Sequence, residues 1–461
     1  MSVISALFDN KAYSFEQAFG ARDITSRKMR EAIKMWFAMY FDGEASTDED
    51  DCQRLPVVIV NKLTKTVFSE YEAEVREGKK AKFARMLLDR LDLIRKEAMQ
   101  QVLVGGGCFV KPILANDGFV FSVVRRDCFI PLERSITGAL TSAEFAEFAE
   151  HGDKCYTLLE RRTVNSAGTL TIENKLYMSL DRGILGTQVP LGSLERYADL
   201  QSMITIPGIY SLGMAYMRTP LMNCVDGSPD GVSVYAPAAK LIRNINRNER
   251  QLNREFENGA SRIIASCDMV RRDTDGKRKL ADDLFVGVDN DPEEVGITIF
   301  SPALREASYL ARKQEYLRNV ESLIGFKRGI LSEVEAAERT ATEITSSAGD
   351  YNLTIQDFQQ MWADMARDLL AICDRLGQQY KKCDSSKFDP AEDIVINWGD
   401  GVLFDRTRTW QEYQQMVASG MLKPELALAW YFDLPHDTPE DFEKIRTNYM
   451  PEMKALVGGD E

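Results

Sequence analysis

The sequence of 461 residues has only two histidines, His151 and His436, and neither lies in a metal-binding spacing such as His-Glu-x-x-His. Its eight cysteines lack the Cys-x-x-Cys spacing of a zinc or redox site. No Gly-Lys-Ser/Thr loop is present to hold nucleotide phosphates. Because nucleophile–base pairs and metal sets are also missing, we expect no catalytic residue, no metal and no cofactor.

Long apolar runs are missing as well. No stretch approaches the roughly 18 residues that a membrane span requires, and no secretion leader opens the chain. We therefore expect no membrane contact, reduced thiols, and use in a cytoplasm or in something assembled there. A net charge of −14 argues against wholesale coating of nucleic acid, so any DNA contact must be local.

What the sequence does contain is three long helical patterns between Gly231 and Leu376. The first, over 236–258, has a basic stripe whose members recur at steps of three and four, which places them on one arc of a helix. The stripe consists of Lys240, Arg243, Arg247, Arg250 and Arg254. The opposite arc holds Leu241, Ile245, Leu252 and Phe256. Such a helix packs against protein on one side and faces water or a polyanion on the other.

The N-terminal half predicts a mixture of helix and sheet. Amphipathic helices are expected over 25–40, 56–77 and 80–104, the last ending at Gly105-Gly106-Gly107. This triple glycine follows a helix and precedes a strand, the reverse of a phosphate loop, so its role is structural. Two hairpins are expected, 108–113 with 119–124 and 156–163 with 170–177, around Asn-Asp-Gly and Asn-Ser-Ala-Gly turns.

After the basic helix, strand-like runs 262–270 and 284–288 surround Asp275-Gly276, which suggests a hairpin or short β-module. Its tip carries a basic cluster, Arg271, Arg272, Lys277, Arg278 and Lys279. Ser301-Pro302 is expected to open the second helix. That helix has a narrow apolar seam at Ala303, Leu310, Leu317 and Ile324.

The third long helix, over 351–382, repeats apolar residues at steps of three and four from Ile355 to Leu376. A strand over 394–398 and helices over 407–419, 423–432 and 438–448 are expected to follow. Residues 383–461 hold 16 acidic and 7 basic side chains, so the tail is acidic. These patterns predict an α+β fold that is predominantly helical.

Several segments, in this order along most of the chain, resemble those of the portal proteins of tailed bacteriophages, the head–tail connectors also found as prophage minor capsid proteins. Gly231-Val232-Ser233 resembles the Gly-x-Ser before the first stem helix, and Asn258–Ile264 the exit into the clip. Thr340–Ile344 resembles the Ala-Thr-Glu-Val before the long wing helix. Asp393–Asp405 with Gly420–Lys423 resembles the lead into the crown, and Val104–Gly106 the end of a wing helix.

The resemblance implies an N-terminal wing over 1–230, a stem helix over 231–260 and a clip over 261–301. A second stem helix over 302–325, a tunnel loop over 326–350, a long wing helix over 351–382 and a C-terminal wing strand and helical crown over 383–461 would follow. It also implies a ring, usually dodecameric, at one capsid vertex of the virion, assembled in the host cytoplasm. Terminase pumps double-stranded DNA through that ring, and capsid or scaffolding protein and head–tail adaptors bind it.

A channel that conducts DNA must not hold it, because many Lys and Arg contacts to phosphate in fixed register would arrest sliding. An acidic protein with a few basic side chains would repel DNA over most of the channel wall and attract it weakly at a few positions. The stripe on 236–258 and the loop residues Lys327 and Arg328, with Glu338 and Arg339 nearby, are the candidate points. Two plainer alternatives also remain: the stripe could be an ordinary solvated helix face, and Lys327 and Arg328 could belong to an ordinary loop. The cluster Arg271–Lys279 has three open readings: motor docking, DNA exit, or protection of a strand edge.

Two other classes of protein remain as alternatives. One is another phage structural ring, such as an adaptor or baseplate component, although such chains are shorter and lack a long helix pair around a β-module. The other is a metal-dependent phosphoryl-transfer enzyme using Glu392, Asp393 and Asp400. Adjacent residues of a strand point to opposite faces, which disfavours a shared metal at Glu392 and Asp393.

Overall fold

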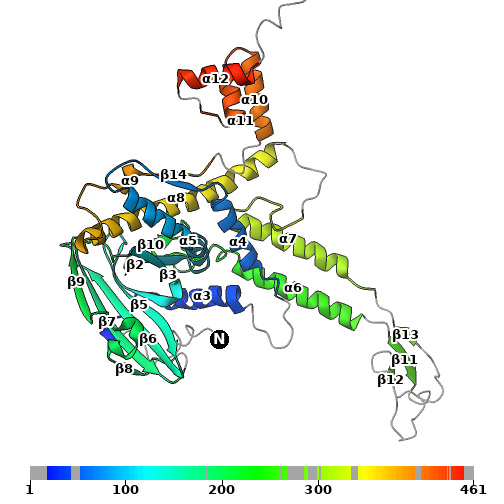
Figure 1. Cartoon of the computed structure of the whole chain (residues 1–461). Helices are drawn as coiled ribbons and strands as arrows, with labels where there is room; N and C mark the ends of the chain where they lie inside the picture. Colours follow the sequence, from blue (N-terminus) through cyan, green and yellow to red (C-terminus); the bar gives the residue numbers. More distant parts are fainter. Residues whose placement is uncertain are drawn as a thin grey trace, which may run out of the picture. The chain divides into compact units, whose positions relative to one another are not determined.

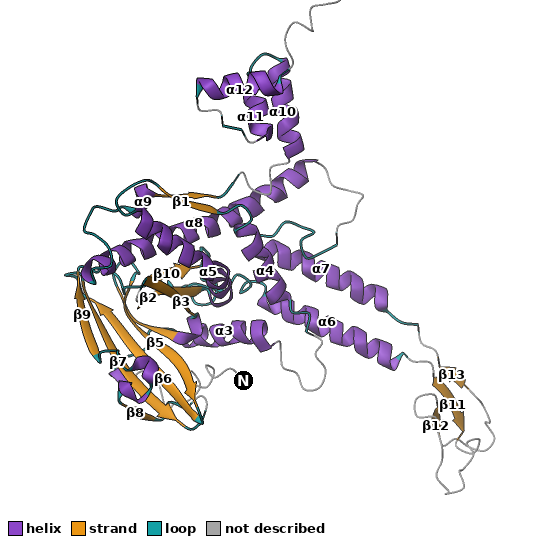
Figure 2. Cartoon of the chain, in the orientation of Figure 1, coloured by secondary structure: helices purple, strands orange, loops and turns teal. Residues whose placement is uncertain are grey.

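The computed structural model describes residues 18–42, 52–115, 117–181, 184–259, 262–266, 285–288, 298–300, 303–333, 341–399, 406–432, 434–435 and 438–450. Helices and strands are both plentiful, which confirms the predicted α+β class (Figures 1 and 2). The chain divides into two compact units. The first comprises residues 1–67 and 73–396, and the second residues 68–72 and 397–461.

The first unit begins with helix α3 (Arg27–Phe37), whose N-terminus is capped because Ser26 Oγ accepts a hydrogen bond from Met29 N. Met29, Ile33, Trp36 and Phe37 are buried along one face of α3. One π-helical turn (Ala38–Asp42) extends it, and α4 (Leu55–Val67) and α5 (Ala81–Gly105) follow. The helix expected over 56–77 is therefore too long. It ends at Val67, and residues 72–75 form strand β1 (Glu72–Val75).

A six-stranded sheet occupies the middle of the N-terminal half. It consists of β4 (Phe129–Arg134), β5 (Leu140–His151), β6 (Lys154–Val164), β7 (Thr169–Ser179), β8 (Thr187–Val189) and β9 (Met203–Pro207). Strands β4 to β8 are adjacent in chain order, and β9 also pairs with β7. The predicted hairpin of 156–163 with 170–177 is confirmed, because β6 and β7 pair antiparallel. In its turn, Asn165 Oδ1 accepts from Ala167 N and Thr169 N.

A three-stranded sheet joins this sheet through aromatic side chains. Its strands are β2 (Gly107–Ala115), β3 (Gly118–Val124) and β10 (Ala215–Arg218), with β2 in the centre. The antiparallel pairing of β2 with β3 confirms the other predicted hairpin. Phe109 on β2 makes edge contacts with Phe129 at 4.8 Å and Phe145 at 5.1 Å. These rings belong to the buried core between the two sheets.

Helices α6 (Ala239–Asn258) and α7 (Glu306–Ile324) lie antiparallel and side by side (Figure 1). Between them in the sequence are β11 (Arg262–Ser266), β12 (Phe285–Val288) and β13 (Thr298–Phe300), which form a three-stranded sheet. The β-module is confirmed, but the hairpin is wrong: β12 pairs with β11 parallel, and β13 supplies the antiparallel neighbour. The predicted start of the second helix at Ser301-Pro302 is also wrong, since α7 begins at Glu306.

Helix α8 (Ala341–Gln379) is 39 residues long and begins ten residues before the expected start. Residues 341–350, which the resemblance assigned to a tunnel loop over 326–350, are helical. Ser, Thr and Gly are weak helix formers there, but extending an existing helix costs far less than nucleating one. The predicted apolar face is buried downstream, at Ile355, Phe358, Trp362, Met365, Leu369, Ile372 and Leu376.

A short helix α9 (Pro390–Asp393) and strand β14 (Ile394–Asn397) come next, and β14 pairs with β1 in a two-stranded sheet. The second unit contains α10 (Arg406–Ala418), α11 (Pro424–Phe432) and α12 (Pro439–Tyr449), which confirms the three predicted helices. Trp410 packs on Tyr431 at 4.4 Å, and Arg446 pairs with Glu425 at 2.7 Å. Within the described ranges, no helix combines the length and apolarity that crossing a membrane demands.

Candidate functional site

Two glycine-bearing segments, far apart in the sequence, meet where the chain enters α6. Gly106 and Gly231 approach so closely that a Cβ on either would collide with the backbone of the other. Thr219 closes the junction: its N–H donates to Gly106 O at 3.0 Å, and its hydroxyl donates to Val232 O at 2.7 Å. Val234 N donates to Leu103 O at 3.0 Å. The end of α5 and the lead into α6 are therefore joined backbone to backbone.

This contact gives a physical reason for two of the sequence segments singled out above, Val104–Gly106 and Gly231-Val232-Ser233. Ser233 Oγ donates to Leu103 O at 3.1 Å, so it satisfies a carbonyl near the end of α5. Tyr235 OH donates to Trp36 O at 2.8 Å, which ties the same segment to α3. The base of α6 is thus fixed against two other helices.

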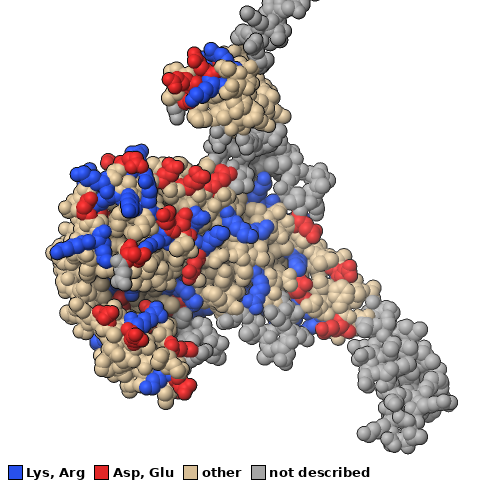
Figure 3. Space-filling model, viewed as in Figure 1, with Lys and Arg blue, Asp and Glu red and all other residues tan. Residues whose placement is uncertain are grey.

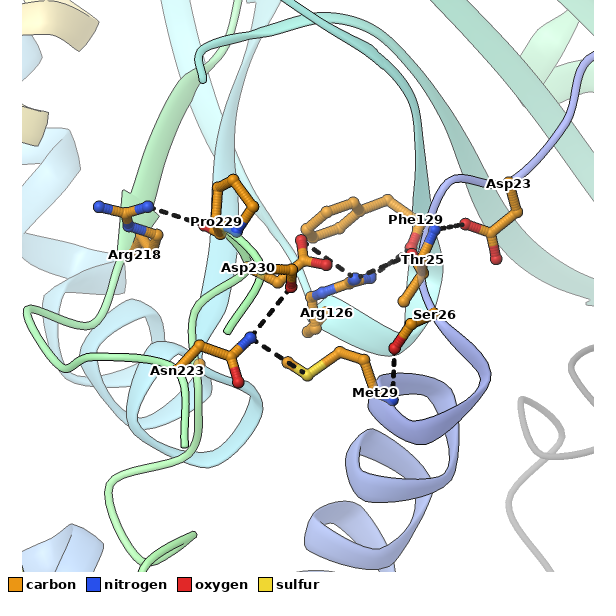
Figure 4. A network of polar contacts seen from close by, with 12 residues as sticks. Asp23, Thr25, Ser26, Met29, Arg126, Phe129, Arg218, Asn223, Pro229 and Asp230 are labelled. Atoms are coloured by element: carbon orange, nitrogen blue, oxygen red, sulfur yellow. Dashed lines mark hydrogen bonds and ion pairs between the residues drawn. The ribbon is translucent and has the colours of Figure 1, made fainter. Parts of the chain in front are cut away.

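A buried polar network lies beside this junction (Figure 4). Arg126 is fully buried, donates from Nη1 to Phe129 O at 2.9 Å, and stacks over the Phe129 ring. Its Nη2 lies 3.7 Å from Asp230, which also pairs with Arg134 at 2.6 Å. Asn223, on the same loop as Asp230, contacts the Met29 sulfur of α3. One buried carboxylate therefore serves two arginines, directly before Gly231.

The structure places the basic stripe of α6 where the period predicted it. Lys240, Arg243, Arg247 and Arg254 are exposed, and Arg250 is half-buried. On the opposite arc, Ile245 and Leu252 are buried, Leu241 is half-buried and Phe256 is 47% exposed in the single chain. The stripe thus lies on a solvent-facing arc of the chain.

Helix α7 covers the other side of α6 through polar contacts that the sequence pattern did not predict. The buried Asn248 donates to Tyr309 O at 3.0 Å, and Asn246 Oδ1 accepts from Gln53 N at 3.1 Å. Amides at these positions break the apolar arc, and no local signal distinguishes them from solvated asparagines. The bond from Asn248 fixes α6 against α7, whereas the bond to Asn246 ties α6 to the segment before α4.

Two ion pairs across the helices engage acidic side chains of α6. Glu249 pairs with Lys313 at 2.9 Å, and Glu255 with Arg305 at 2.7 Å. The hydrogen bond from the Arg305 guanidinium holds the pKa of Glu255 below its ordinary value. Because these two carboxylates face α7, they do not lie among the basic side chains of the stripe on the exposed arc.

The loop candidates Lys327 and Arg328 lie in a tightly held turn, which we call the post-α7 turn (residues 325–333). The carboxylate of Glu321 is fully buried and accepts four hydrogen bonds from this turn. The donors are Gly329 N at 3.3 Å, Leu331 N at 2.5 Å, Ser332 N at 2.9 Å and Ser332 Oγ at 2.7 Å. Glu321 was missed from the sequence. Its signal is a glutamate beside the apolar seam, between Val320 and Ile324, shortly before two glycines.

Further contacts hold the turn from outside. Lys62 on α4 donates to Ile330 O at 2.8 Å, and the Phe326 ring makes an edge contact with Tyr351 at 5.8 Å. Gly325 and Gly329 both have positive φ, at 74° and 92°, where a side chain would be strained. Arg328 is exposed at the outside of the turn, and Lys327 is half-buried. The turn therefore presents these cations on a fixed backbone.

Several predicted site residues lie outside the described residues. These are Glu338 and Arg339 of the loop, and Arg271, Arg272, Lys277, Arg278 and Lys279 of the basic cluster. They stay predictions. His436 and Asp400 also lie outside, and His151 is exposed at the β5–β6 turn.

Glu392 and Asp393 are not in a strand, as the sequence argument assumed, but in the first turn of α9. Asp393 Oδ2 accepts from Asp389 N at 2.8 Å and so closes that turn. Among the described residues, no three His, Cys, Asp or Glu side chains gather as a metal site would require. Burial raises the pKa of the Cys108 and Cys373 thiols, which keeps both protonated.

No protein-family model matches the sequence, and none of the curated proteins matches it. Among solved structures, the chain is similar to one described as the neck of a native GTA particle with C12 symmetry. The identity is 11%, 90% of this chain and 96% of that chain are covered, and the TM-score is 0.45. A second, the neck of an empty GTA particle with C6 symmetry, has 12% identity, 90% and 97% coverage and a TM-score of 0.46. Site residues do not carry over at this identity, so function must come from this chain's own geometry.

Proposed function

We propose that this chain is the subunit of a phage portal ring, which forms the channel for genome packaging and ejection at one capsid vertex. The observation that carries the proposal is the antiparallel pair α6–α7. It brackets a small β-sheet in the sequence and leads into the 39-residue helix α8. The order of the portal-like segments along the chain supports it. So does the contact between two of them, Val104–Gly106 and Gly231-Val232-Ser233.

Ring closure is supported by apolar side chains that a single chain leaves in water. On and beside the helix pair, Phe256, Leu304, Leu310 and Leu323 are each 41–49% exposed. Leu317 and Ile324 of the predicted seam are buried within the subunit, so only part of the seam is satisfied by the chain itself. A neighbouring copy would cover the remainder, as obligate interfaces do.

Passage of DNA is supported by the distribution of charge. On the face shown in Figure 3, Lys and Arg of the first unit are scattered among Asp and Glu rather than gathered in one field. The chain as a whole carries a net charge of −14, most of it in residues 383–461, so it repels phosphate overall and offers no continuous basic surface on this face. The stripe on α6 and the pair Lys327–Arg328 are the proposed points of weak guidance.

The remaining assignments belong to the same proposal. The ring has about twelve subunits by its resemblance to portals, the terminase large subunit meets the clip near Arg271–Lys279, and capsid or scaffolding protein and a head–tail adaptor bind elsewhere. The chain itself catalyses nothing, so purified protein should show no metal-dependent nuclease or ATPase turnover. Turnover that disappears in Asp393→Asn would favour the enzyme alternative instead.

Ring formation is the first prediction. Purified protein, examined by mass photometry and by end-on negative-stain images, should form closed rings with a central hole. Leu310→Glu should break them into monomers, because it places a charge on the apolar part of α7 that a neighbour would cover. Ile136→Glu, at a fully exposed position outside the helix pair, is the matched control and should leave rings intact. Monomers only, across salt conditions, would contradict the ring.

Charge reversal in the post-α7 turn is the second prediction. Phage carrying Lys327→Glu and Arg328→Glu should still form rings, but should package DNA about tenfold less well, because guidance becomes repulsion at the same fixed backbone positions. DNA-filled heads are counted by DNase protection. The exposed pair Lys381 and Lys382, reversed in the same way, should package normally. Equal packaging by both double variants would remove Lys327 and Arg328 from the mechanism.

A further inference from the structure

A short segment before α3, residues 18–25, crosses one face of the six-stranded sheet, and we call it the N-terminal strap. At one end, Lys175 on β7 donates from Nζ to Ala18 O, and Arg161 on β6 donates to Phe19 O at 3.3 Å. At the other end, Ile24 N donates to Pro131 O on β4 at 3.1 Å. The strap therefore passes over β5, the strand between β4 and β6.

Beneath the strap lies Glu144, on β5. Its side chain is fully buried, and neither carboxylate oxygen has a hydrogen-bond partner among the described residues. Its cross-strand neighbours are Ile130 on β4 and Arg161 on β6. A buried ionised carboxylate without hydrogen bonds is costly, so the group takes up a proton instead. Burial accordingly raises the pKa of Glu144 to about 8.

Two cations, Arg161 and Lys175, lower the pKa of Glu144 through their charges, but neither donates a hydrogen bond to it, because both are engaged elsewhere while the strap is docked. Arg161 forms an ion pair with Glu173 at 2.6 Å besides its bond to the strap. Lys175 donates to the strap and lies 4.6 Å from the centre of the Phe19 ring, over which Arg161 also stacks at 5.2 Å.

The other titratable groups around Glu144 do not neutralise it either. Asp23 of the strap adds a negative charge that raises the pKa of Glu144, while Asp23 itself lies near Arg30 and Arg126. Tyr177 on β7 faces the same surface, and Glu144 in turn raises its pKa. Among the described residues, the positive groups that act on Glu144 are thus Arg161 and Lys175, and both are bound to the strap.

We propose that the N-terminal strap is a proton-controlled closure: it stays docked while Glu144 is protonated and is released when Glu144 ionises. Release frees the Arg161 and Lys175 side chains from the carbonyls of Phe19 and Ala18, so both can then pair with the Glu144 carboxylate. The docked and released arrangements exchange one set of charge-assisted hydrogen bonds for another. This inference is independent of the proposed portal function, since it concerns a single subunit.

The direction of the pH effect follows from the two protonation states. The docked strap holds Glu144 with a pKa of about 8, and the released state returns it toward the ordinary 4.5. Docking therefore receives its full stabilisation below about pH 4.5 and loses it as the pH rises to about 8. Between these limits one proton is released on opening, so the opening constant should rise by about tenfold per pH unit and then level off.

The strap also has a route to the candidate functional site. It runs directly into α3, whose first turn Ser26 caps, and Trp36 O of α3 accepts the Tyr235 hydroxyl at the base of α6. A change in the strap therefore acts on an element that fixes α6.

Hydrogen–deuterium exchange of peptides covering 18–25, corrected for intrinsic rates and measured from pH 6 to pH 9, tests the proposal. In the wild-type chain, protection should fall by about tenfold per unit between pH 6 and pH 8 and change little above. Glu144→Gln cannot ionise, so its strap should stay protected across the range. Glu133→Gln, an exposed carboxylate on β4, is the control and should follow the wild-type curve.

A second variant keeps the test decisive if Glu144→Gln does not fold. Lys175→Met removes one tie to the strap and should leave residues 18–25 unprotected already at pH 6, while exchange in β6 and β7 is unchanged. Constant wild-type protection from pH 6 to pH 9 would overturn the proposal. So would a Glu144→Gln curve that falls like that of the wild type, or a Lys175→Met strap as protected as the wild type at pH 6.

Discussion

Replacing Gly231 by alanine should destabilise this chain by about 3 kcal/mol or more, the upper end of what overpacking a core typically costs, because the added group meets backbone atoms. The added Cβ would overlap Gly106 O and lie 2.7 Å from Arg218 Cγ. The arginine side chain can move, but the Gly106 backbone is held by its own hydrogen bonds, Gly106 N to Val102 O and Thr219 N to Gly106 O. We expect little soluble protein, and a much lower urea midpoint for what is soluble.

Gly78→Ala is the matched control for this substitution. A Cβ at Gly78 meets nothing within 4 Å and its backbone is not in the left-handed region, so the same methyl should change stability by less than about 1 kcal/mol. An unchanged urea midpoint for Gly231→Ala would show that the two backbones can separate without cost. The junction would then not be what fixes the base of α6.

Local features of this fold could be predicted because their causes are local. The β2–β3 and β6–β7 hairpins follow from alternating strands around turns that Asn and Gly favour, as Asn165 and Gly168 illustrate. The basic stripe of α6 follows from the helical period alone. The apolar face of α8 was also predictable, because burial repeats at the same steps as the sequence.

Features that depend on distant partners could not be predicted. Residues 72–75 read as the end of a helix, but they form β1 because β14, more than 300 residues later, supplies the other strand. The parallel pairing of β11 with β12 likewise contradicts the hairpin that Asp275-Gly276 indicated, since β13 occupies the antiparallel side of β11. Strand choice is set by which edges are free in three dimensions, and one sequence does not show this.

The candidate site also contains one feature that the sequence predicts and one that it does not. The sequence predicts Lys327 and Arg328 as charged loop residues that follow the end of a helix at Gly325. The role of Glu321, which holds their backbone, could not be predicted, because a glutamate beside an apolar seam is usually a solvent-exposed residue at the edge of that seam. Only the fold shows that the chain turns back and directs three backbone N–H groups at this carboxylate.

Glu321→Ala is therefore expected to have the second large effect. It removes the acceptor of four hydrogen bonds, which leaves the N–H of the buried Ser332 and of the half-buried Leu331 without that partner and frees the exposed Gly329 N–H. The expected loss is about 2–4 kcal/mol, because unsatisfied buried donors and broken charge-assisted bonds are both costly. Trypsin should then cleave faster after Lys327 and Arg328, whose backbone is no longer held. Cleavage rates under native conditions and urea midpoints measure the two effects.

Graded substitutions separate a positioning role from simple destabilisation. Glu321→Gln keeps one acceptor oxygen and the shape of the side chain, so we expect an intermediate loss and partial protection from trypsin. Glu315→Ala, on an exposed turn of α7 where its carboxylate is 63% exposed, should cost less than about 0.5 kcal/mol and leave cleavage unchanged. If Glu321→Ala is cleaved no faster than Glu315→Ala, the turn holds its shape without the carboxylate. Cleavage by trypsin and loss of packaging could instead increase together from Glu321→Gln to Glu321→Ala. Guidance of DNA would then require the fixed backbone at Lys327 and Arg328, and not their charge alone.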